Sequence, residues 1–230
     1  MTQSHKILIV GASRGLGSAM AEEFIKKGYH VIGTVRDKSV STPLAKLAKK
    51  YPSELSVEEV DINKADQVSA LYHKLQDQKL DILFVNAGIL PDRTSKFSEI
   101  NEADFTHAML NNALNPVRFV DKFENLVKEN GLIGVMTSRV GSIADNESGG
   151  KPIYRSSKTA LNQLMMNFSH EYPDRACVLM HPGWVRTSMG GENAPFEIQD
   201  SVIPMTKTLI SLEGKKGIRF INYKGDVLPW

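Results

Sequence analysis

The chain has 230 residues, of which 41% are hydrophobic and 23% are charged, a composition typical of a globular protein with one substantial core. Its 28 basic and 26 acidic residues leave a net charge of +2 without a long run of like charges, which argues against a nucleic-acid-binding surface. The single cysteine, Cys177, excludes an internal disulfide. No apolar stretch is long enough to span a bilayer. We therefore expect one cytoplasmic domain that acts on small molecules.

Short apolar runs alternate with longer segments of helical period along the chain. The predicted strands cover residues 6–10, 30–35, 55–60, 80–85, 132–137, 176–180 and 218–222. The predicted helices cover residues 15–27, 64–76, 102–130 and 153–172. This alternation is typical of a doubly wound α/β domain, in which helices cover both faces of a parallel sheet. Ligands bind beyond the carboxyl ends of such strands, so functional residues are expected directly after strands.

A glycine-rich stretch, GASRGLG, directly follows the first predicted strand. Gly11 can adopt positive φ, while Gly15 and Gly17 let backbone N–H groups and a helix N-terminus approach an anionic pyrophosphate. Ser13 adds a hydroxyl donor. The spacing Gly-x-x-x-Gly-x-Gly differs from the common dinucleotide fingerprint Gly-x-Gly-x-x-Gly. By itself the stretch therefore predicts a phosphate-binding turn and a plain tight turn about equally.

Two arginines favour NADP over NAD as the nucleotide. Arg14 lies within the glycine turn, and Arg36 follows the second predicted strand, where an NAD-binding protein usually places a carboxylate against the ribose 2′-OH. Two guanidiniums at this place can hold a 2′-phosphate. Asp37 is adjacent and weakens the argument, and the alternative is that both arginines are ordinary surface residues.

Two further strand ends fit the same nucleotide site. Asp61 closes the third predicted strand and is expected to accept an adenine amino proton, with Ile62 packing on the ring. Asn86, Ala87 and Gly88 follow the fourth strand as a small turn that exposes backbone. Asp and Asn at strand ends also serve as caps or turn formers. Only the agreement in position between these residues supports a binding role.

The stretch YRSSK places Tyr154 and Lys158 four residues apart on one face of a predicted helix. A nearby ammonium favours the phenolate and lowers the pKa of a tyrosine, so the pair can exchange a proton with a carbonyl or alcohol. Ser138 follows the preceding predicted strand and can donate a hydrogen bond to a substrate oxygen. Thr137 and Ser142 are alternative donors at this place.

A break in the long predicted helix supplies a further candidate. Pro116 has no N–H, so the carbonyl of Asn112 loses its helical partner. A free carbonyl facing the site can bind a water that relays protons to Lys158. The alternative is a kink filled by ordinary packing, with Asn111 as the inward residue.

In this order along almost the whole chain, the glycine turn, Asp61, the NAG turn, Asn112, Ser138, the Tyr-Lys pair and HPGWVRT at 181–187 resemble the short-chain dehydrogenase/reductase family. Within it, TSRVGSIADNESGG and YKGDVLPW are similar to the branch of C-factor proteins and the carbonyl reductase sniffer. The segment between Ser138 and Tyr154 is longer than in the commonest family form, and this difference affects the substrate entrance.

The resemblance implies a Rossmann-type sheet of seven strands in the order 3-2-1-4-5-6-7 within a single domain. It implies hydride transfer between NADP(H), in preference to NAD(H), and a carbonyl or alcohol substrate. The implied catalytic residues are Ser138, Tyr154, Lys158 and Asn112. The implied cofactor-binding residues are Gly11, Ser13, Arg14, Gly15, Leu16, Gly17, Arg36, Asp61, Ile62, Asn86, Ala87, Gly88, Tyr154, Lys158, Pro182, Gly183, Val185 and Thr187.

The leading hypothesis is an NADPH-dependent carbonyl reductase with Tyr154 as proton donor. The alternative is a nucleotide-binding signalling protein of C-factor type with little turnover, and a purely structural domain ranks third. We expect a homodimer or homotetramer, no membrane partner and a substrate lid at residues 188–200. The six histidines show no pair at zinc-ligand spacing, so no catalytic metal is predicted.

Overall fold

Seven parallel strands form one sheet in the order β3-β2-β1-β4-β5-β6-β7, as the computed structural model describes for residues 5–91 and 96–230. The strands are β1 (Lys6–Val10), β2 (His30–Val35), β3 (Leu55–Glu59), β4 (Leu80–Val85), β5 (Val127–Met136), β6 (Ala176–His181) and β7 (Gly217–Asn222). This arrangement confirms the predicted Rossmann-type fold and its strand order. Among the described residues, no helix combines the length and the apolar character needed to cross a membrane.

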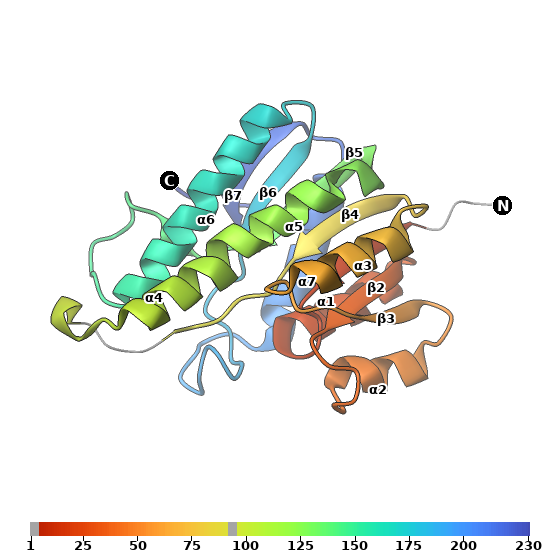
Figure 1. Cartoon of the computed structure of the whole chain (residues 1–230), viewed down its shortest axis with the longest axis horizontal. Coiled ribbons are helices and arrows are strands. Elements are labelled where there is room, and N and C mark those ends of the chain that lie inside the picture. The colour runs from red at the N-terminus through yellow and green to blue at the C-terminus, as the bar shows by residue number, and fades with distance from the viewer. Residues whose placement is uncertain (1–4, 92–95) are drawn as a thin grey trace.

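Helices cover both faces of the sheet (Figure 1). The helices are α1 (Gly15–Lys26), α2 (Pro43–Lys50), α3 (Ala65–Leu75), α4 (Glu102–Met109), α5 (Asn115–Phe123), α6 (Pro152–Glu171) and α7 (Ile198–Ser211). Helices α1, α2 and α7 pack on one face, and α3, α5 and α6 pack on the other. Each face thus has its own hydrophobic core.

Successive strand residues belong to opposite cores, as strand geometry requires. In β1, Ile7 and Ile9 pack beneath α1, α2 and α7, whereas Leu8 and Val10 pack beneath α3, α5 and α6. Strands buried on both faces are continuous apolar runs. That property explains why β1, β2 and β4 occur at their predicted bounds.

The predicted helix 102–130 is too long, because the chain changes conformation several times in this stretch. The order is α4, a π-helical turn (Leu110–Leu114), α5, a 3-10 turn (Glu124–Leu126) and then β5 from Val127. The early part of β5 carries the exposed residues Glu129 and Asn130, and its pairing with β4 shifts register after Leu80. An irregular, half-exposed strand start lacks the apolar run used to predict strands.

Two helices, α2 and α7, were not predicted, although local signals mark both. Thr42 caps α2 through a hydrogen bond from the Ala45 amide at 3.1 Å, and Pro43 occupies the first turn. A capping box joins Glu197 and Asp200 at the start of α7. Helix α7 begins at Ile198, so the last residues of the predicted lid 188–200 belong to a helix.

The strand order reverses between β1 and β4, and their ends Val10 and Val85 are paired neighbours. The chain leaves β1 toward α1 on one face and leaves β4 toward α5 on the other. The divergence opens a crevice at the carboxyl ends of the strands. The polar residues predicted to bind a nucleotide lie at this crevice.

Candidate active site

A cavity of about 650 Å³ lies at the carboxyl ends of the central strands; we call it the first cavity. Most of the predicted cofactor-binding residues line it: Gly11, Ser13, Arg14, Gly15, Leu16, Arg36, Asp61, Ile62, Asn86, Ala87, Gly88, Tyr154, Lys158, Pro182 and Thr187. Gly17, Gly183 and Val185 lie outside its lining. Residues far apart in the sequence therefore meet in one crevice, as the strand-end argument predicts.

The glycine turn brings backbone close to backbone. Gly11 has φ +82°, and a Cβ there would lie 2.8 Å from the Ala87 backbone. A Cβ on Gly17 would lie 2.3 Å from the Gly11 oxygen, so Gly17 serves the contact between helix and turn rather than the cavity wall. No side chain caps the start of α1, which leaves its N-terminal amides available to an anion. These observations fit a pyrophosphate at the turn.

Arg14 and Arg36 line the first cavity and are exposed. Within the described parts of the chain, neither side chain has a hydrogen bond or an ion pair. The neighbouring Asp37 does not occupy them, because its carboxylate accepts hydrogen bonds from the Ser39 amide at 2.8 Å and hydroxyl at 2.6 Å. Those bonds also lower the pKa of Asp37. Two unpaired guanidiniums thus face the cavity, and the adjacent acid is turned away.

Asp61 acts as a turn former and also lies where it could contact an adenine. Its Oδ1 accepts hydrogen bonds from the Asn63 amide at 3.0 Å and side chain at 2.9 Å, as in a turn-forming aspartate. Asp61 also lines the first cavity beside Ile62. On the neighbouring strand end, the Asn86 side chain donates to the Gly11 oxygen at 2.6 Å and so ties the end of β4 to the glycine turn.

A second cavity, of about 980 Å³, adjoins the first. Ser138, Tyr154, Gly183 and Val185 line it, and Tyr154, Pro182 and Thr187 line both cavities. Tyr154 therefore lies in the wall that the two cavities share. A group bound in either cavity can reach the phenol of Tyr154.

Hydrogen bonds distinguish Ser138 from the two competing hydroxyls. Thr137 donates to the Asn162 side chain at 2.7 Å in a fully buried contact, and Ser142 donates to the Trp230 oxygen at 3.2 Å. Ser138 lines the second cavity beside Tyr154, and its hydroxyl lowers the pKa of that phenol. Of the three, Ser138 is the hydroxyl placed to meet a substrate.

Burial dominates the acid–base properties of the Tyr154–Lys158 pair. Burial raises the pKa of Tyr154 to about 12, against a smaller lowering by the Ser138 hydrogen bond. Burial also lowers the pKa of Lys158 to about 8. The Lys158 Nζ lies 5.9 Å from the Tyr154 ring centre and donates to the Met136 oxygen at 2.9 Å. The predicted lowering of the tyrosine pKa by the ammonium is not seen: burial raises this pKa, and the opposing cause is the Ser138 hydroxyl.

Asn112 occupies the π-helical turn that precedes Pro116. Its side chain is fully buried and accepts from the Ile89 amide at 2.8 Å, while its Nδ2 donates to the Ile89 oxygen at 2.9 Å and to Ser157 at 3.0 Å. Asn111 instead lines the first cavity. The Asn112 side chain thus fixes the chain after the NAG turn, and its role in a proton relay stays a prediction.

The chain after β6 forms the wall that both cavities share near Thr187. Pro182 accepts a hydrogen bond from Ser201 at 2.6 Å. Gly183 has φ +84°, and a Cβ there would lie 3.1 Å from the Tyr223 ring. Trp184 donates its indole N–H to the Gly190 oxygen at 2.8 Å. These bonds join residues 182–191 into one loop, and the opening of residues 188–200 as a lid stays a prediction.

Sequence reasoning missed two polar residues that organise the first cavity. Thr34 lines it and accepts a hydrogen bond from the Gly11 amide at 3.0 Å. Asn63 joins Asp61 to the helical break, donating to Asn111 at 2.9 Å and accepting from Asn115 at 2.8 Å. Thr34 is a polar residue near the end of an apolar strand, and this position in the sequence could have predicted its place in the site. Asn63 depends on long-range contacts that the sequence does not show.

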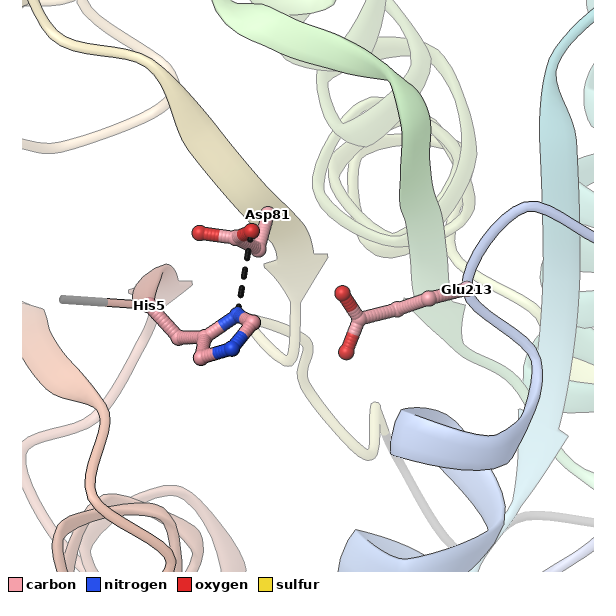
Figure 2. A group of neighbouring side chains, drawn as sticks. All are labelled: His5, Asp81 and Glu213. Atoms are coloured by element: carbon pink, nitrogen blue, oxygen red, sulfur yellow. Dashed lines mark hydrogen bonds and ion pairs between the residues drawn. The ribbon is translucent and has the colours of Figure 1, made fainter. Parts of the chain in front are cut away.

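A separate polar cluster lies at the amino-terminal edge of the sheet (Figure 2). His5, Asp81 and Glu213 offer ligand atoms within 4.8 Å of one another. The Asp81 carboxylate is already bonded to the Lys128 ammonium at 2.8 Å and to the Lys6 amide at 2.8 Å. Because a cation already neutralises Asp81, the cluster joins strand ends rather than offering a metal site.

The short chain dehydrogenase family model matches residues 5–197, and the chain belongs to that family of oxidoreductases. The 1-hydroxy-2-glutathionyl-2-methyl-3-butene dehydrogenase of Rhodococcus sp. (strain AD45) is 29% identical, covering 97% of this chain and 99% of that protein. The C-signal protein of Myxococcus xanthus is 34% identical, covering 66% of this chain and 93% of that protein.

Solved structures agree closely with this fold. A short-chain dehydrogenase/reductase from Burkholderia multivorans with bound NADP is 45% identical, with a TM-score of 0.97 over 99% of this chain and 100% of that chain. A carbonyl reductase from Pseudomonas aeruginosa PAO1 in complex with NADP is 33% identical, with a TM-score of 0.92 over 99% and 100%. The carbonyl reductase Sniffer of D. melanogaster is 31% identical, with a TM-score of 0.89 over the same shares. These similarities confirm the predicted family resemblance.

Proposed function

We propose that the protein is an NADPH-dependent carbonyl reductase that converts an aldehyde or ketone to an alcohol, with Tyr154 as proton donor. The observation that carries the proposal is the position of Tyr154 in the wall between the two cavities, beside Ser138 and Lys158. Carbonyl reductase structures with NADP bound are among the most similar structures found, which supports the same assignment.

In this proposal the substrate carbonyl occupies the second cavity, with its oxygen toward Ser138 and Tyr154. Ser138 donates a hydrogen bond to that oxygen, and Tyr154 transfers its phenolic proton to it as the carbon accepts a hydride. Reduced nicotinamide supplies that hydride when the cofactor is bound. The Lys158 ammonium stabilises the resulting phenolate. One hydride and one proton thus convert the carbonyl to the alcohol.

The first cavity's lining fits a dinucleotide. The glycine turn and the uncapped start of α1 would hold the pyrophosphate, and Asp61 with Ile62 would meet the adenine. Lys158 would bond the nicotinamide ribose. Thr187 and Pro182, together with the adjacent Gly183 and Val185, would position the carboxamide.

Replacing Arg14 and Arg36 together by alanine tests the assignment of NADP. Guanidinium–phosphate bonds are charge-assisted, and we expect their loss to lower kcat/KM for NADPH by about 100-fold and to leave the value for NADH within about threefold. Steady-state kinetics with each nucleotide measures both effects. Arg118→Ala, at an exposed site outside the first cavity, is the matched control. An equal loss with both nucleotides would contradict a 2′-phosphate contact.

A panel of aldehydes, ketones, quinones and 3-oxoacyl compounds tests the reductase function. We expect NADPH oxidation with at least one class, at kcat/KM well above that with NADH. Nucleotide binding is measured separately by calorimetry on the same preparation. Tight NADPH binding without reduction of any panel member would instead favour the second candidate, a nucleotide-controlled signalling protein, which the similarity to C-signal motivates.

A further inference from the structure

Lys151 lies at the rim of the second cavity, immediately before the helix that carries Tyr154 and Lys158. Its backbone has φ 48° and ψ 52°, and among the described residues it is the one non-glycine residue with positive φ. A lysine in this left-handed region is strained. The strained backbone places Lys151 in the lining of the second cavity.

The local chain holds Lys151 in this conformation. Gly149 and Gly150 before it also have positive φ, at 60° and 72°, and Pro152 after it disfavours the right-handed helical region for Lys151. The Arg155 Nε donates to the Gly149 oxygen at 2.9 Å and to the Gly150 oxygen at 3.0 Å. Arg155 is therefore a positioning residue that fixes the approach to Lys151.

The lining of the second cavity has more positively than negatively charged side chains. The charged residues in its lining are Arg139, Asp145, Lys151, Arg155 and Glu192. Arg139 and Asp145 form an ion pair at 2.6 Å and largely cancel. Burial lowers the pKa of His181, also in the lining, to about 4, so this residue is neutral near pH 7.

The remaining charges leave the α6 side of the cavity positive. In the described part of the chain, the partners of the Arg155 side chain are neutral oxygens, including those of Val140 and Ser148. The Lys151 side chain has no hydrogen bond or ion pair within residues 5–91 and 96–230. The opposing acid, Glu192, belongs to the loop after β6. Arg155 and Lys151 therefore lie on the same wall without an acidic partner there. Of the two, the Lys151 ammonium also has no hydrogen bond within the described residues.

The second cavity also has an apolar part. Its lining includes Leu90, Val140, Trp184, Val185 and Met189, and Trp184 and Met189 are exposed there. Such side chains bind an aromatic ring or another apolar body and leave its polar ends to the polar groups of the wall. Tyr154 and Ser138 can bind one polar group of such a ligand, and Lys151, in the lining of the same cavity, can bind a second.

We propose that the substrate is an aromatic or otherwise apolar carbonyl compound with a carboxylate at the end remote from the carbonyl, and that Lys151 binds this carboxylate. The inference rests on the proposed reductase function and names its substrate class. Lys151 stands three positions before Tyr154, just outside the helix that begins at Pro152. Both residues line the second cavity, and the long lysine side chain can reach a group bound beside the phenol. One benzene ring is a suitable spacer between the carbonyl and the carboxylate.

The test compares 4-formylbenzoate with its neutral methyl ester as substrates, using NADPH. We expect the wild type to favour the acid about tenfold in kcat/KM, mainly through KM, as one charge-assisted contact implies. Lys151→Asn keeps a residue that tolerates positive φ but lacks charge, and it should bring the ratio to about one. Lys151→Arg should retain the preference. Lys46→Asn, at an exposed site on α2, should behave as wild type.

A binding measurement separates this inference from the proposed function. Calorimetry with 4-(hydroxymethyl)benzoate and its methyl ester should show about tenfold tighter binding of the acid to wild type and equal binding to Lys151→Asn. If the ester binds and reacts as well as the acid, or if Lys151→Asn keeps the preference, the inference is overturned while reduction of the ester still supports a reductase. If the acid binds through Lys151 but nothing is reduced, the reductase function fails and the anion site stands.

Discussion

We expect Tyr154→Phe to lower kcat for carbonyl reduction by about 1,000-fold or more, because phenylalanine has no proton to donate to the substrate oxygen. The pKa of Tyr154, raised to about 12 by burial, keeps the phenol protonated near neutral pH, as a proton donor for reduction requires. The ring itself is retained, so the wall between the two cavities keeps its shape. NADPH affinity should stay within about threefold of wild type.

The measurement pairs single-turnover reduction with a fluorescence titration of NADPH on the same sample. Tyr72→Phe is the matched control, since the Tyr72 hydroxyl accepts a hydrogen bond from Asn125 at 2.8 Å at an exposed site and lines neither cavity. Unchanged turnover in Tyr154→Phe would reject the assigned acid. A signalling function that is independent of turnover would instead survive this substitution.

Sequence patterns predicted the strands well where hydrophobicity alone determines their bounds. Strands such as β1 and β4 are apolar runs buried on both faces, so their bounds followed from hydrophobicity. The start of β5 at Val127 was missed because it is irregular and carries exposed residues. The capping signals of α2 and α7 were present in the sequence but were not used. Capping signals together with the apolar pattern would therefore predict more of the secondary structure than the apolar pattern alone.

The candidate site shows a different limit. Residues at strand ends could be placed together because parallel strands end at a common edge. Sequence spacing could not show that Asp37 turns toward Ser39 or that Thr137 is bonded to Asn162. The rise in the Tyr154 pKa also depends on burial by the packed surroundings. These properties arise from long-range contacts, which spacing along the chain does not determine.

A second large effect is expected at Lys158, where catalysis and stability should change in opposite directions. Lys158→Met should lower kcat by roughly 100-fold or more, because the phenolate loses its neighbouring cation. It should also raise the midpoint of thermal unfolding. Burial lowers the pKa of Lys158 from 10.5 to about 8, which corresponds to roughly 3 kcal/mol of cost for the buried charge. Methionine removes the charge and keeps a side chain of similar length, at the loss of the hydrogen bond to the Met136 oxygen.

The pH dependence identifies the cause of the stabilisation. Below pH 8 the lysine is charged in both the folded and the unfolded protein, and the cost of burial is complete. Between pH 8 and 10.5 the folded protein has released this proton while the unfolded chain still holds it, so wild-type stability gains with rising pH relative to Lys158→Met. Urea unfolding from pH 6 to 10 should therefore show a difference between the two proteins that is largest below pH 8 and shrinks above it. A difference that is independent of pH would assign the effect to packing rather than to the buried charge, and Lys46→Met, at an exposed site, should show neither effect.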